Sequence, residues 1–131
     1  MKLLLASALL LTVMQSHAQD TSRLITFTRV EVEAEYPGGA KGWNSFLAKN
    51  LHYPDDAVNN EISGTVVVQF IVDADGNISD IHPVSGPTKG GLREEAVRVV
   101  GLSGKWTPAT QNGHKVRSYK KVPLQFKMSF G

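Results

Sequence analysis

Acidic and amide side chains gather near the middle of the chain, at Asp73, Asp75, Asn77 and Asp80. Closely spaced oxygen ligands of this kind are what a calcium ion requires. The spacing differs from that of a twelve-residue calcium loop, because Gly76 comes too early and no glutamate stands at the closing position. Asp75-Gly76 is also typical of a hairpin turn, since this pair tolerates positive φ angles. The cluster therefore favours a turn over a metal site.

Other catalytic and metal-binding arrangements are also poorly supported. The histidines after residue 18 are His52, His82 and His114, and no two of them form an i, i+4 pair. The chain has no cysteine, which excludes disulfides, thiolate zinc sites and a cysteine nucleophile. Ser85 follows a predicted strand, but no nucleophile-elbow motif surrounds it. We therefore predict no catalytic residue, no metal ligand and no cofactor, and we do not expect an enzyme.

The segment from Gly64 to Ile81 organises the rest of the chain. Apolar side chains recur at every second position from Val66 to Val72, which places them on one face of a strand. Val67 and Ile71 make the other face partly apolar, so we expect a central strand that is covered on both faces. A second strand, from Ile78 to Val84, returns beside the first. This hairpin is the predicted centre of a sheet.

Two helices are predicted from apolar side chains at helical spacing, one from Ala40 to Leu51 and one from Leu92 to Leu102. Their apolar stripes consist of Trp43, Phe46, Leu47 and Leu51, and of Leu92, Ala96, Val99 and Val100. A short helical turn is expected from Asp55 to Val58. Before the first helix, we expect a short strand or extended arm from Val30 to Glu35 with an acidic outer face, and little order from Gln19 to Thr28.

The last predicted element is a long amphipathic strand from Val116 to Met128. Pro123 lies within it and lacks the N–H that a central strand donates, so we place this strand at a sheet edge. An edge strand offers unpaired backbone groups to an extended peptide, a mode of recognition called β-augmentation. The candidate partner-binding residues are Val116, Arg117, Ser118, Tyr119, Lys120, Lys121, Val122, Leu124, Gln125, Phe126 and Lys127.

The order of these elements predicts one domain of the α+β class. The chain has 131 residues, enough for a single core. An arm, a helix, a hairpin, a second helix and a long strand are expected to form two layers. One layer is an antiparallel three-stranded sheet, and the other consists of two helices on one face of that sheet.

The first residues have the features of a signal peptide. Lys2 precedes an apolar stretch from Leu3 to Met14, and Ser16 and Ala18 place small residues where a signal peptidase reads. We predict cleavage after Ala18 and export. The alternative is an uncleaved membrane anchor, but a helix from Leu3 to Met14 would be shorter than the hydrocarbon core of about 30 Å. Removing Lys2 lowers the formal charge from +2 to +1, so no nucleic-acid partner is expected.

The order and spacing of several short motifs resemble the C-terminal domain of TonB energy-transducer proteins, in the form common among Bacteroidetes-type bacteria. The motifs are Tyr36-Pro37-Gly38-Gly39, Tyr53-Pro54 with Ala57, Ile62-Ser63-Gly64, the hairpin from Val66 to Ile78, Ser85-Gly86, Leu92 with Ala96, Trp106 with Pro108, Asn112-Gly113, Val116-Arg117 and the ending from Val122 to Met128. The resemblance covers residues 32–128. We therefore expect a signal peptide at 1–18, an N-terminal arm at 19–31 and a TonB C-terminal-like domain at 32–131.

This resemblance implies a periplasmic binding domain without an active site. Its last strand, here Val116 to Met128, would receive the TonB box of an outer-membrane transporter by strand addition and so support energy-dependent uptake. Full transducers of the family also have a transmembrane helix and a long linker, which residues 1–31 do not provide. The alternative is a stand-alone periplasmic scaffold, or a domain that forms a homodimer through the same edge. No direct small-molecule substrate is expected in either case.

Overall fold

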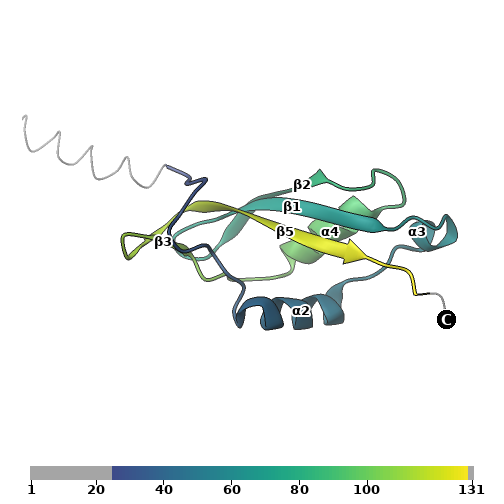
Figure 1. Cartoon of the computed structure of the whole chain (residues 1–131), viewed down its shortest axis with the longest axis horizontal. Helices are drawn as coiled ribbons and strands as arrows, with labels where there is room; N and C mark the ends of the chain where they lie inside the picture. The colour runs from purple at the N-terminus through teal and green to yellow at the C-terminus, as the bar shows by residue number, and fades with distance from the viewer. Residues whose placement is uncertain (1–24, 130–131) are drawn as a thin grey trace, which may run out of the picture.

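The computed structural model describes residues 25–129, so the predicted signal peptide lies outside the described residues. The elements are α2 (Gly39–Asn50), α3 (Asp55–Asn59), β1 (Gly64–Val72), β2 (Ile78–Ser85), α4 (Leu92–Gly101), β3 (Ala109–Gln111), β4 (His114–Val116) and β5 (Ser118–Phe126). Figure 1 shows a layer of long strands with α2 and α4 beside it. Between residues 25 and 129, no helix is both long and apolar enough to cross a membrane.

The main sheet has three antiparallel strands in the order β2-β1-β5, with β1 in the centre as predicted. The register between β1 and β5 runs without a break from Gly64 opposite Phe126 to Val72 opposite Ser118. Together with helices on one side, this sheet confirms the predicted α+β fold. The bounds of β1, β2, α2 and α4 differ from the predicted ones by two residues at most.

The core lies between the sheet and the helices. Val66, Val68, Phe70 and Val72 project from one face of β1 and are fully buried. They join the buried stripe of α4 and, from β5, Val122, Leu124 and Phe126. The predicted covering of both faces of β1 is only partly confirmed. On the other face Ile71 is buried, but Val67 and Gln69 are only partly buried, because both helices pack on the first face.

Trp106 connects the sheet to the first helix. The residue is 4 % exposed, and its ring lies 4.9 Å from the ring of Phe70 and 5.2 Å from that of Trp43, between ring centroids. Its indole Nε1–H donates to Ser103 Oγ at 2.9 Å, which satisfies the buried polar edge of the ring. Trp106 therefore links three elements of the core.

The turn between β1 and β2 uses the acidic residues that could have suggested calcium. One oxygen of Asp73, Oδ1, accepts hydrogen bonds from the backbone N–H groups of Asp75 and Asn77, both at 2.9 Å. Gly76 has φ 88°, and a Cβ there would lie 2.2 Å from the carbonyl oxygen of Trp106. Within residues 25–129, no group of three histidine or acidic side chains is placed to hold a metal ion.

The prediction of one long last strand is wrong, because two strands, β4 and β5, occupy this part of the chain. β3 and β4 form a separate hairpin across Asn112 and Gly113, which have φ 52° and 77° and suit a tight two-residue turn. β5 begins after Arg117 and pairs with β1. The break occurs where the backbone of Arg117 turns to bond the N-terminal arm.

The arm is more ordered than expected near its start. The N–H of Phe27 donates to the carbonyl of Arg117 at 2.9 Å, and the N–H of Tyr119 donates to the carbonyl of Phe27 at 3.0 Å. Further along, Val32 pairs with Thr110 and Glu35 with Thr107. The predicted extended arm with exposed glutamates is confirmed for residues 30–35, whereas the expected fraying is wrong for Phe27.

Candidate functional site

β5 is an edge strand of the main sheet, as Pro123 predicted. The bonds to Phe27 show which of its backbone groups face outward. The carbonyl of Arg117 and the N–H of Tyr119 both form hydrogen bonds with the arm. The backbone N–H and carbonyl groups of the odd-numbered residues of β5 therefore point away from β1. In an antiparallel ladder such residues alternate with those that bond the neighbouring strand. The even-numbered residues from Ser118 to Phe126 therefore hold β5 to β1.

This alternation explains how a proline fits into β5. Pro123 is odd-numbered, so its missing N–H belongs to the outer edge and no bond to β1 is lost. Lys121 and Gln125, on either side, present both an N–H and a carbonyl outward. Within residues 25–129, neither of these two N–H groups has a backbone partner on the outer side.

The structure divides the sequence-predicted binding residues into three groups. Buried side chains at Ser118, Val122, Leu124 and Phe126 belong to the core, and the Ser118 hydroxyl has no hydrogen-bond partner among the described residues. Exposed side chains belong to Tyr119, Lys121, Gln125 and Lys127. The remaining residues are engaged elsewhere: Val116 in β4, Arg117 with Thr26 Oγ1 at 2.9 Å, and Lys120 with Glu33 at 3.5 Å.

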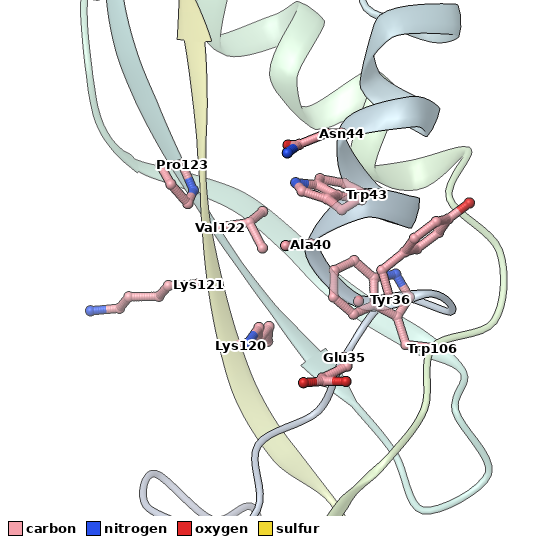
Figure 2. Close-up of a pocket in the computed structure, with 11 residues that line it drawn as sticks. Glu35, Tyr36, Ala40, Trp43, Asn44, Trp106, Lys120, Lys121, Val122 and Pro123 are labelled. Atoms are coloured by element: carbon pink, nitrogen blue, oxygen red, sulfur yellow. The ribbon is translucent and has the colours of Figure 1, made fainter.

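A groove runs between α2 and β5 and consists of two adjoining hollows. The first has a volume of about 340 Å³, and Figure 2 shows the side chains that line it. The second has a volume of about 560 Å³ and lies toward the end of the helix. Asn44 and Pro123 line both hollows, so we treat them as one feature, the α2–β5 groove. Its helical wall consists of Gly39, Ala40, Trp43, Asn44, Leu47, Ala48 and Leu51.

The helical wall of the groove was not predicted from the sequence. The apolar side chains of α2 recur at helical spacing, but no residue of α2 is fully buried, in contrast to the five buried residues of α4. Trp43, Leu47 and Leu51 pack against the core with one side and line the groove with the other. The small residues Ala40 and Ala48 beside this stripe were the available sequence signal, because they leave room along the helix.

Charged groups border the apolar floor of the groove. Val122 points from β5 toward α2, and Lys121 points away from the helix (Figure 2). The first hollow also has Glu35 and Lys120 in its lining. The Lys120 side chain is 19 % exposed and pairs with Glu33, whose carboxylate is largely in solvent. Such an arrangement suits an extended peptide, with apolar side chains in the hollows and backbone groups on β5.

Glu95 of α4 fixes the position of α2, the other wall of the groove. Its buried carboxylate accepts hydrogen bonds from Arg98 Nε at 2.6 Å and from the backbone N–H of His52 at 2.7 Å. Arg98 also donates to the carbonyl of Asn50 at 3.0 Å. Burial raises the pKa of Glu95, but the hydrogen bonds from Arg98 and His52 outweigh burial, so its pKa lies below the usual value of 4.5.

We expect Glu95→Gln to destabilise the protein by about 1–3 kcal/mol at neutral pH, because hydrogen bonds to a charged acceptor are lost. A carboxyl with a lowered folded-state pKa stabilises the fold above its unfolded-state pKa, and this contribution disappears as the pH falls through the folded-state value. The wild type should therefore lose more stability than the variant on acidification below 4.5. Urea unfolding across pH would measure this, with the exposed neighbour Glu94→Gln as control. Parallel pH profiles for wild type and Glu95→Gln would contradict it.

A protein-family profile matches this chain. The sequence profile described as Gram-negative bacterial TonB protein C-terminal matches residues 49–128, which is more than half of the chain. The chain belongs to this family. The TonB match extends from the end of α2 through β5, so most of the helical wall of the groove precedes it.

One similar solved structure is the NMR solution structure of the TonB C-terminal domain of Helicobacter pylori. It is 22 % identical in sequence, with 72 % of this chain and 91 % of that chain covered, at a TM-score of 0.47. Among curated proteins, none matches this chain.

Proposed function

We propose that this protein is a periplasmic TonB-type binding module that takes up the TonB box of an outer-membrane transporter as an added strand on β5. Energy-dependent uptake through that transporter would be supported by this contact. The observation that carries the proposal is the outer edge of β5, whose backbone groups at Lys121 and Gln125 face the α2–β5 groove without backbone partners among the described residues.

The opposite edge of the sheet is much less suited to strand addition. β2 has two irregularities in its register with β1, and Asp80 within it has a φ of 52°. Such irregularities interrupt the even row of donors and acceptors that an incoming strand needs. β5 keeps an unbroken register over its whole length. A partner strand is therefore expected on β5 and not on β2.

The proposal includes the expected processing and the absence of catalysis. We propose that residues 1–18 are removed on export, that residues 19–31 form an arm and that residues 32–131 form the binding domain. The domain acts by binding, because the described part of the chain offers a strand edge and a groove and its acidic turn residues are used in the fold. No cofactor or metal is required for this mode of recognition.

The test is a titration of the mature chain, starting at Gln19, with TonB-box peptides from transporters of the same genome. We expect saturable binding, with amide NMR shifts concentrated at Lys121 and Gln125 and along α2. A peptide of the same composition in scrambled order is the control. No binding at millimolar peptide, or shifts concentrated on β2, would contradict the proposal.

A further inference from the structure

We propose that Pro123 makes β5 an edge that accepts a foreign strand and rejects a second copy of this chain. The inference rests on the proposed use of β5 for strand addition. It starts from the position of the proline, which lies at the middle of the outer edge, between Lys121 and Gln125, and lines both hollows of the groove. Its outward side offers a carbonyl acceptor and no donor.

When a foreign strand pairs with β5, one hydrogen bond is absent because Pro123 has no N–H. Whichever direction the strand runs, one of its inward carbonyls faces the proline ring without a hydrogen bond. The backbone groups of Lys121 and Gln125 can still pair fully, and the carbonyl of Pro123 still accepts one bond. The proline ring is exposed and apolar, so it also supplies contact area between the two hollows.

When a second copy of the chain pairs with β5, the missing N–H of Pro123 counts twice. In a two-fold antiparallel pairing of β5 with itself, each copy contributes its own Pro123, so two hydrogen bonds are absent from the shared ladder. The same pairing brings Lys121 of both copies onto one face of the joined sheet, where like charges repel. Each missing hydrogen bond is expected to weaken the pairing by about two- to tenfold. Self-pairing is thus disfavoured more than pairing with a peptide.

The matched variants are Pro123→Ala, which restores the outward donor, and Pro123→Ala with Gln125→Pro, which moves the missing donor two residues along the same edge. Neither change touches a residue that bonds β1. We expect Pro123→Ala to bind a TonB-box peptide about two- to tenfold more tightly. We also expect it to self-associate, by sedimentation velocity, at concentrations where the wild type is monomeric. In sedimentation velocity the double variant should self-associate less than Pro123→Ala, because one outward donor is again missing from each copy, and thermal unfolding would show that all three proteins are folded.

The two measurements separate this inference from the proposed function. Sedimentation needs no peptide, so a Pro123→Ala protein that stays as monomeric as the wild type overturns the inference even if peptides bind. A wild type that already dimerises through β5 overturns it as well. If no peptide binds any variant, the proposed function fails. Self-association of Pro123→Ala without self-association of the wild type would still support the inference that Pro123 protects this edge from a second copy.

Discussion

Replacing both Lys121 and Gln125 by proline is expected to lower the affinity for TonB-box peptides by about 5- to 150-fold while the protein stays folded. Both N–H groups face outward, so the substitutions remove two donors from the binding edge and none from the ladder with β1. Each hydrogen bond contributes about 0.5–1.5 kcal/mol, which together gives this range. With Pro123 between them, three successive outward positions then lack a donor. Peptide titration measures the affinity, and thermal unfolding measures the fold.

The matched control is the double variant Lys121→Ala and Gln125→Ala, which loses the same side chains and keeps both N–H groups. It should bind peptides nearly as well as the wild type if the main chain of β5 makes the contact. Equal losses in the proline and alanine variants would show that the side chains bind the partner. That result would contradict strand addition on this edge.

Local patterns predicted the elements that the sheet is built from. The alternation from Val66 to Val72 and the turn at Asp75-Gly76 define β1 and β2 almost to the residue, because both signals come from neighbouring residues. Asn112-Gly113, one of the motifs of the resemblance, is a local turn signal of the same kind. What the sequence did not show is that two hairpins are present, since Val116 and Ser118 continue one alternating pattern through a change of partner strand.

The parts of the site that were not predicted from the sequence depend on contacts between residues that are distant in the chain. Phe27 pairs with β5 across roughly ninety residues, and no local pattern indicates that it does. Pro123 predicted an edge, but the side to which its missing N–H points follows only from the register of β5 with β1 and the arm. Periodicity likewise gives α2 an apolar face without telling whether a neighbouring element covers it.

Trp106→Ala is expected to destabilise the domain by about 3–5 kcal/mol, the usual range for truncating a buried tryptophan. The ring contacts Phe70, Trp43 and Tyr36, with centroids between 4.9 and 5.5 Å apart, and few atoms could move to fill the space. The loss also leaves Ser103 Oγ without its indole donor. A typical domain has about 5–15 kcal/mol of stability, so the variant should be close to unfolding. Urea denaturation would measure the change.

Trp43→Ala provides the comparison that separates stability from binding. Trp43 is only partly buried and lines the groove, so its truncation should reduce stability by only about 1–2 kcal/mol. Peptide affinity should fall by about tenfold or more, because large aromatic side chains in a groove often dominate binding. If Trp43→Ala destabilised the fold as much as Trp106→Ala and left peptide binding unchanged, Trp43 would be a core residue and the α2–β5 groove would lose its main apolar anchor. If instead Trp106→Ala caused the larger loss of stability and Trp43→Ala lowered peptide affinity, α2 would be a wall of the binding site. The stability of the core would then depend mainly on α4 and Trp106.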